Sequence, residues 1–296
     1  MQNVFILMTH RCQRSCGYCF EAQLGVRKAG VELPAARLAE LAVHLVSPGR
    51  SSVIISGGEP LLRPDCEALI AALSRDGIPA LLISNGDALS EERSRSLAAA
   101  GLMALTLSAA DFVQVKDAAA AAAAVNRLVQ LLEGARAAGI PGLSVIYLIS
   151  STSFQHLPSL VQRIEPLGVS VLPQPLCGSS AAPLTGALSP RALPRDTWRE
   201  IWSMCGISSR SMYTAFVDGL YGGLPTKPAW CGMGGTAAVL EPDGEVFACF
   251  HRRDLQCGNL HSGNPAAVRQ RLKLAAMETA TAACFGEHCV SLFSGR

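Results

Sequence analysis

Three cysteines near the amino terminus are the residues best suited to bind a metal. The segment MTHRCQRSCGYCF, residues 8–20, carries Cys12, Cys16 and Cys19 at the spacing C-x3-C-x2-C. Closed structural sites normally take four protein ligands, so three thiols leave one metal position open. The spacing favours three irons of a [4Fe-4S] cluster, because zinc ligands usually come in C-x2-C pairs. Three quarters of a zinc site, or a set of buried cysteines, are the alternatives.

A second group of cysteines lies toward the carboxyl end. Cys231 precedes, and Cys249 lies at the end of, the hairpin pattern AAVLEPDGEVFACF, in which Pro-Asp-Gly joins two expected strands. The turn would fold the strands back and let the two thiols meet. Cys257, Cys284 and Cys289 follow.

Composition excludes several function classes. The formal net charge of +2 and the scattered basic residues give no footprint for nucleic acid. No stretch is apolar for long enough to span a membrane, and residues 1–10 lack the basic start of a signal peptide. We therefore expect a cytoplasmic protein, in which the 11 cysteines bind metal or are buried rather than form disulfides.

Short apolar runs alternate with longer amphipathic stretches over the first 173 residues. The expected strands are 4–8, 52–56, 80–84, 103–108, 143–149 and 169–173. The expected helices are 34–47, 65–76, 90–100, 118–138 and 154–167. This repeat predicts an α/β fold with a parallel sheet, closed or partly closed into a (β/α)6 barrel; an open doubly wound sheet is the alternative. In a barrel, the cysteine motif would lie at the carboxyl end of the first strand, where active sites form.

The motif C-x3-C-x2-C, with Tyr18 before its last cysteine, resembles the signature of the radical S-adenosylmethionine (SAM) superfamily. The resemblance implies a cluster held by Cys12, Cys16 and Cys19, whose open iron binds SAM, and it places Tyr18 among the residues that bind SAM. One electron then cleaves SAM to methionine and a 5′-deoxyadenosyl radical, which abstracts hydrogen from a substrate.

Other strand ends carry residues similar to those of the same family. SGGEP at 56–60 resembles its GGE motif, which implies that Gly57, Gly58 and Glu59 contact the methionyl amino group; a plain turn is the alternative. SNG at 84–86 implies a ribose contact by Asn85, and Ser108 is a further candidate. The family often has an aspartate two residues after that serine, whereas here Ala110 stands there and Asp111 follows.

The carboxyl-terminal pattern resembles the SPASM and twitch auxiliary-cluster domains, whose opening is C-x9–15-G-x4-C. Cys231, Gly244 and Cys249 fit it. The resemblance implies a second [4Fe-4S] cluster held by Cys231, Cys249, Cys284 and Cys289, with Cys257 as a substitute ligand or a spare buried thiol. A zinc site is the alternative. The implied domains are a radical SAM core at 1–180, a bridging region at 181–230 and an auxiliary domain at 231–296.

The family suggests a peptide maturase that crosslinks, oxidises or epimerises a ribosomally made precursor peptide. A radical SAM dehydrogenase of aminocyclitol-like small molecules is the alternative, and a plain electron carrier would not need the GGE and SNG elements. We expect a flavodoxin- or ferredoxin-type electron donor. The cysteine motif begins at Cys12, so a leader-peptide recognition domain is expected to be a separate protein.

Overall fold

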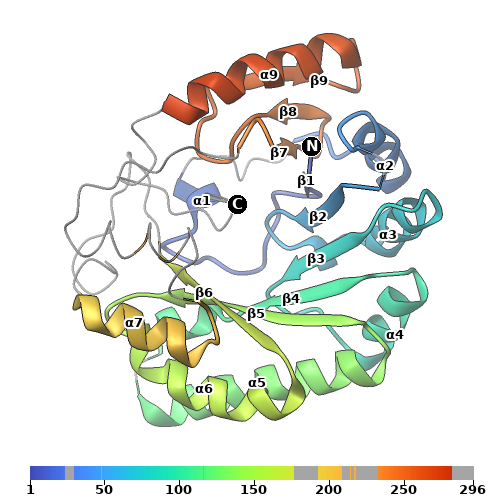
Figure 1. Ribbon diagram of the computed structural model, residues 1–296. Helices are drawn as coiled ribbons and strands as arrows, with labels where there is room; N and C mark the ends of the chain where they lie inside the picture. Colours follow the sequence, from blue (N-terminus) through green and yellow to red (C-terminus); the bar gives the residue numbers. More distant parts are fainter. Residues whose placement is uncertain are drawn as a thin grey trace.

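The computed structural model describes residues 1–23, 30–47, 49–115, 117–176, 193–208, 214, 217 and 233–281. Within these ranges nine strands form one sheet in the order β6-β5-β4-β3-β2-β1-β7-β8-β9 (Figure 1). The strands are β1 (Asn3–Leu7), β2 (Ser52–Ser56), β3 (Ala80–Ser84), β4 (Ala104–Ser108), β5 (Gly142–Ile149), β6 (Ser170–Pro175), β7 (Ala237–Leu240), β8 (Glu245–Phe247) and β9 (Gln256–Asn259). The helices are α1 (Phe20–Gln23), α2 (Ala35–Val43), α3 (Cys66–Arg75), α4 (Glu91–Ala99), α5 (Ala118–Ala137), α6 (Leu157–Ile164), α7 (Arg195–Met204) and α9 (Pro265–Thr281). Short 3-10 turns are η1 (Pro60–Leu62), η2 (Ala110–Val113), η3 (Ser153–His156) and η4 (Glu165–Leu167).

Strands β1 to β6 form the predicted parallel sheet. Every neighbouring pair from β1 to β6 is parallel, with Val4 opposite Val53 and Val53 opposite Ala80. Because parallel strands are covered on both faces, they consist of nearly continuous apolar residues, and the sequence expectation for β2 and β3 is confirmed to the residue.

The crossover helices pack on one face of the sheet. Leu38 of α2, Leu69 of α3, Leu97 of α4, Leu128 of α5 and Leu160 of α6 all belong to the main core together with the outward residues of the strands. Figure 1 shows these helices outside a curved sheet. A doubly wound fold needs helices on both faces, so the partial (β/α)6 barrel is the confirmed arrangement.

Helix ends follow local chemistry. The Ser90 hydroxyl accepts a hydrogen bond from the Arg93 N–H at 3.0 Å and caps α4. Gly101 follows α4 with φ +91°, a left-handed conformation that suits glycine at a helix end. The helix expected over 154–167 instead begins with η3, continues as α6 and ends with η4.

The predicted hairpin continues the same sheet rather than forming a separate one. β7 pairs with β1 in parallel, with Asn3 opposite Ala237, and β8 is antiparallel to β7. β9 pairs with β8, and α9 packs over this end through Leu272, which is completely buried.

The concave face of the sheet has its own small apolar cluster. Phe5 and Leu7 of β1 and Ile54 of β2 pack there against Val239 and Phe247 of the hairpin. No helix in the described part of the chain is long and apolar enough to cross a membrane.

Candidate functional site

The three amino-terminal cysteines lie on the segment that leaves the carboxyl end of β1, residues 8–19, here called the cysteine loop. Cys12, Cys16 and Cys19 are each partly exposed. The Cys19 N–H donates to the Cys16 carbonyl at 3.0 Å, so the second half of the motif forms a tight turn. By contrast, Cys66 in α3 is completely buried, and this burial raises the pKa of its thiol to about 12.

Two glycines bring the end of β2 against the backbone of the cysteine loop. The Gly58 N–H donates to Thr9 O and the Glu59 N–H donates to Arg11 O, both at 2.8 Å. A Cβ on Gly57 would lie 2.3 Å from Thr9 O, and one on Gly58 would lie 2.3 Å from Arg11 O. Gly57 also has φ +125°. Packing against the loop therefore already requires both glycines, and their contact with SAM stays a prediction.

The Glu59 carboxylate joins the ends of β2 and β3. Its side chain is almost fully buried; one oxygen accepts from the Ser84 hydroxyl at 2.8 Å and the Leu61 N–H at 3.1 Å. The other oxygen accepts from the Asn85 N–H at 2.8 Å. Burial raises the pKa of Glu59 in spite of these three donors. The predicted pairing of Glu59 with the ammonium of SAM stays a prediction.

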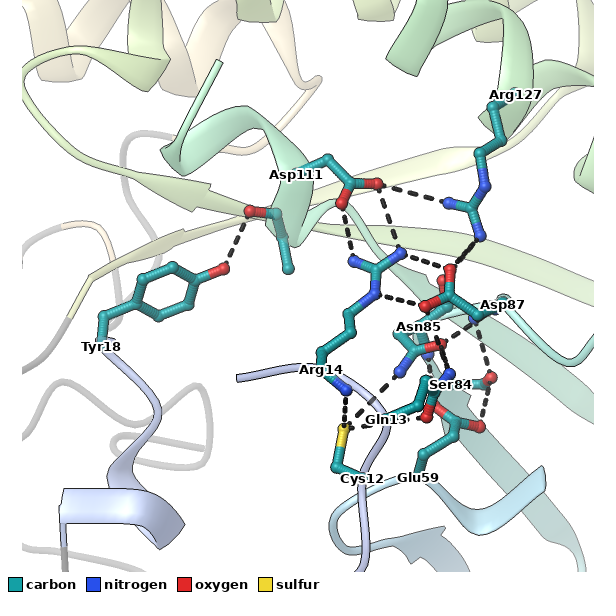
Figure 2. Close-up of polar contacts among 12 residues, drawn as sticks. Cys12, Gln13, Arg14, Tyr18, Glu59, Ser84, Asn85, Asp87, Asp111 and Arg127 are labelled. Carbon is teal, nitrogen blue, oxygen red and sulfur yellow. Dashed lines mark hydrogen bonds and ion pairs between the residues drawn. The ribbon is translucent and has the colours of Figure 1, made fainter. Parts of the chain in front are cut away.

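Asn85 faces the cysteine loop, as Figure 2 shows. Its amide nitrogen lies 3.9 Å from the Cys12 sulfur, as a donor. Its amide oxygen accepts from Gln13 Nε2 at 3.1 Å and from the Asp87 N–H at 2.9 Å. The SNG segment and the first cysteine are thus in direct contact.

Arg14, between the first two cysteines, is the centre of an ion-pair network (Figure 2). Its guanidinium donates to Asp87 twice at 2.6 Å and to Asp111 at 2.8 Å. Arg127 of α5 reaches the same carboxylates at 2.5 Å and 3.3 Å. The hydrogen bonds from Arg14 hold the pKa of Asp87 below its ordinary value, and Asp87 in turn raises the pKa of Arg14. The network ties the cysteine loop to the segments that follow β3 and β4.

Tyr18 anchors the far end of the cysteine loop. Its ring packs with Val113 and Leu176, and its hydroxyl donates to Ala110 O at 2.8 Å. Burial raises the pKa of Tyr18, so the hydroxyl stays protonated. Ser108 is the last residue of β4 and is partly buried.

A second group of charges joins the cysteine loop to the hairpin. His10 Nε2 lies 2.8 Å from a Glu241 carboxylate oxygen, and His10 Nδ1 lies 3.7 Å from Glu21 of α1. Arg253 donates to the other oxygen of Glu241 at 2.5 Å and stacks 3.6 Å from the Phe247 ring centroid. Burial opposes a charge on His10, but the two carboxylates raise its pKa to about 9. Burial also opposes a charge on Glu241, but His10 and Arg253 hold its pKa below the ordinary value.

Two of the carboxyl-terminal cysteines lie on opposite faces of the sheet. Cys249 belongs to the concave-face cluster, beside Phe5 and Phe247, whereas Cys257 belongs to the main core on the helix side. Burial raises the pKa of the Cys257 thiol to about 11, and this thiol donates to Leu255 O at 3.5 Å. The other three predicted ligands of this group, Cys231, Cys284 and Cys289, lie outside the described residues.

The cysteine loop fits an iron–sulfur cluster by its donors. Three partly exposed thiols follow one strand, and the Cys12 sulfur accepts from the Arg14 N–H at 3.4 Å and from Asn85, contacts that stabilise a thiolate. Within the described ranges, no three Cys, His, Asp or Glu side chains converge as ligands of one metal ion. The cysteine loop therefore supplies three thiols suited to bind iron, but their sulfur atoms do not converge on one metal position.

The charged residues that hold the cysteine loop were not predicted from the sequence. Arg14, Asp87 and Arg127 were not singled out, nor were Glu21 and Glu241. A signal existed for two of them: Arg14 lies within the cysteine motif, and Asp87 follows the SNG segment directly.

Comparison with known proteins gives a family and several relatives. The sequence profile of the Radical SAM superfamily matches residues 6–164, more than half of the 296 residues. A PqqA peptide cyclase of Streptomyces rochei is 28% identical over 255 residues, which cover 83% of this chain and 68% of that protein. A PqqA peptide cyclase of Gluconobacter oxydans strain 621H is 30% identical over 169 residues, 54% of this chain and 45% of that protein. This chain thus matches only about half the length of several of these relatives.

Solved structures share the fold at low sequence identity. The structure of anSMEcpe with bound AdoMet has a TM-score of 0.66 at 16% identity and covers 97% of this chain and 87% of that one. Streptococcus suis SuiB bound to precursor peptide SuiA has a TM-score of 0.63 at 14% identity, over 84% of this chain and 60% of that one. A cysteine loop at the end of β1, a partial barrel and a matching profile lead to one conclusion: this chain belongs to the radical SAM superfamily.

Proposed function

We propose that this protein is a peptide maturase that modifies a ribosomally synthesised precursor by abstracting hydrogen from it. The observation that carries the proposal is the similarity to PqqA peptide cyclases, which in the Streptomyces rochei protein extends over 83% of this chain. The change in the peptide would be a crosslink, an oxidation or an epimerisation. A flavodoxin- or ferredoxin-type protein would supply the electron, and a separate protein would recognise the leader peptide.

Family membership implies SAM and one [4Fe-4S] cluster as cofactors. When bound, they supply a one-electron cleavage of SAM that yields methionine and a 5′-deoxyadenosyl radical. We assign Cys12, Cys16 and Cys19 as the cluster ligands. Their support is the shared loop, the partial exposure of each thiol and the donors that face the Cys12 sulfur.

For SAM itself we propose contacts from the ends of the first strands. Gly57, Gly58 and Glu59 would face the methionyl group, while Asn85 and Ser108 would face the ribose. Asn85 already contacts Cys12, which supports a position next to the cluster. The Tyr18 hydroxyl donates to Ala110 O, so we propose that Tyr18 holds the loop rather than a reacting atom.

We further propose an auxiliary [4Fe-4S] cluster held by Cys231, Cys249, Cys284 and Cys289. Cys257 is assigned as a core thiol, because it lies on the other face of the sheet from Cys249 and its pKa is raised by burial. The domain proposal remains a core at 1–180, a bridging region at 181–230 and an auxiliary domain at 231–296. We also propose a cytoplasmic location, because a reducing compartment keeps ligand cysteines from forming disulfides.

The proposal is tested by anaerobic reconstitution with iron and sulfide, dithionite as reductant, and a short peptide encoded beside the gene. We expect 5′-deoxyadenosine and a modified peptide, measured by mass spectrometry: a crosslink or dehydrogenation removes two hydrogens, whereas an epimerisation in D2O adds one deuterium. The triple change C12A/C16A/C19A should abolish 5′-deoxyadenosine formation. If the triple variant still cleaves SAM, the cluster assignment is wrong; if wild type cleaves SAM but turns over a small aminocyclitol instead of the peptide, the maturase proposal is wrong.

A further inference from the structure

The turn of the carboxyl-terminal hairpin contacts both the cysteine loop and the segment that leads to α2. Glu241, in the turn between β7 and β8, contacts His10 through its side chain at 2.8 Å. The next residue, Pro242, accepts a backbone hydrogen bond from Leu33 at 2.8 Å, in the segment that leads to α2. Two independent contacts thus fix the hairpin turn against the amino-terminal segment.

The contact through His10 reaches both ends of the cysteine motif. His10 lies two residues before Cys12, and its second ring nitrogen faces Glu21, which lies two residues after Cys19. His10 and Glu21 therefore flank the three cysteines in the sequence, and Glu241 of the hairpin turn contacts His10.

Both carboxylates that face His10 are buried, so they depend on their protein partners. Glu21 and Glu241 are 3% and 2% exposed, so neither carboxylate can replace its protein partners with bulk water. A buried carboxylate that loses a charged partner is left with an uncompensated charge. Arg253 shares the second oxygen of Glu241, which keeps this carboxylate ionised and fixed in direction.

We propose that Glu241 is a positioning residue for the cysteine loop, so that the hairpin forms part of the support of the SAM-cleaving site. The inference rests on the proposed function only where it takes the cysteine loop as the place where the cluster and SAM bind. It makes the hairpin more than a carrier of auxiliary-cluster ligands. Its matched control is Glu245, four residues along the same hairpin, whose carboxylate contacts Gln256 at 2.7 Å instead of the loop.

The first experiment uses the full chain without iron or SAM. Hydrogen exchange followed by mass spectrometry compares wild type, E241Q and E245Q. Loss of a hydrogen bond to a buried carboxylate corresponds to roughly a ten- to hundredfold change in a local opening equilibrium. We expect amides of residues 8–21 to exchange about tenfold faster in E241Q, with β3 to β5 unchanged, and no change in E245Q.

The second experiment uses the reconstituted enzyme. We expect E241Q to raise the KM for SAM in uncoupled cleavage about tenfold more than it lowers kcat, because the loop is misplaced rather than removed. The electron paramagnetic resonance spectrum of the reduced cluster with SAM should change in E241Q and not in E245Q.

The outcomes separate this inference from the proposed function. Unchanged exchange at 8–21 in E241Q overturns the inference, and so does equal disturbance by E245Q or faster exchange across the whole sheet. If C12A/C16A/C19A still cleaves SAM while E241Q loosens residues 8–21, the proposed cluster site fails and the positioning role of Glu241 stands.

Discussion

Arg14 shows how one side chain inside a ligand motif can act on structure instead of chemistry. Its guanidinium is mostly buried and pairs with two carboxylates, Asp87 and Asp111, that come from different strand ends. Bidentate pairing requires the planar fork of arginine, which lysine lacks. The spacing of the cysteines predicts a ligand role, but only the fold shows which side chains hold the loop that carries them.

Removing the guanidinium should therefore cost stability. We expect R14A to lower the free energy of unfolding by about 1–3 kcal/mol, because Asp87 and Asp111 lose the cation that pairs most closely with both and keep the weaker pairing with Arg127. R14K should recover part of the loss. Urea denaturation measures the change. R199A, which removes an exposed pair with Asp196, is the control and should stay within about 0.5 kcal/mol; equal losses in the two variants would contradict the role of Arg14.

Asp87 gives this network a defined response to acid. Because Arg14 lowers its pKa below 3.8, its stabilising charge is fully present above that pH and disappears as pH falls through the lower folded value. We expect D87N to be less stable than wild type by about 1 kcal/mol at pH 6, with the difference shrinking toward pH 3. Denaturation curves at the two pH values test this, and a difference that grows in acid would refute it.

At the scale of elements, the position of the hairpin in the sheet is the feature that the sequence explains least. Apolar runs predict β2 and β3 to the residue, because a parallel strand that is buried on both faces is apolar along nearly its whole length. The Pro-Asp-Gly turn likewise predicts β7 and β8, and Gly244 has the expected positive φ of +89°. The partner of β7 was not predictable, because pairing with β1 is a contact between distant segments that no local pattern encodes.

In the candidate site, too, some residues could be predicted from the local sequence and others could not. Residues that would bind a ligand, such as Cys12 and Asn85, could be proposed from spacing and from strand ends. Residues that hold those ligands, such as Glu241, could not, since its only signal is a position in the fold next to His10. Helix α9 was also missed, because its polar and apolar residues follow no strong helical period.

The positions of Cys249 and Cys257 on opposite faces of the sheet lead to a prediction about iron content. Cys257 points into the main core, so C257A should keep about the wild-type iron content after anaerobic reconstitution. C249A, on the concave face, should lose the iron of one cluster, about four atoms per chain. Iron analysis and absorption spectra measure this. Equal iron loss in both variants, or stoichiometric zinc in wild type, would contradict the proposed ligand set.

At the scale of the molecule, one core connects the barrel and the hairpin. Leu272 of α9 is completely buried in the same cluster as Leu38 of α2 and Leu240 of β7. The boundary proposed at residue 231 therefore divides the sequence without dividing this core.

Because the barrel and the hairpin share one core, we expect them to unfold together in a single transition. We expect L272A to lower the free energy of unfolding of the whole protein by about 2–5 kcal/mol, from lost burial and the cavity left behind. Circular dichroism and tryptophan fluorescence should give one coincident urea transition. L274A, at an exposed position of the same helix, is the control; an early transition confined to the hairpin would contradict a single core.

The parallel pairing of β1 with β7 also sets an order of events during synthesis. Ala237, the partner of Asn3, lies 234 residues further along the chain, so it is synthesised well after Asn3. At the usual rates of translation this delay is on the order of ten to fifty seconds. Throughout that interval β1 can pair only with β2, and Glu241 has not yet reached His10. The cysteine loop and strands β1 to β6 are therefore synthesised before Glu241, the hairpin residue that contacts the loop through His10.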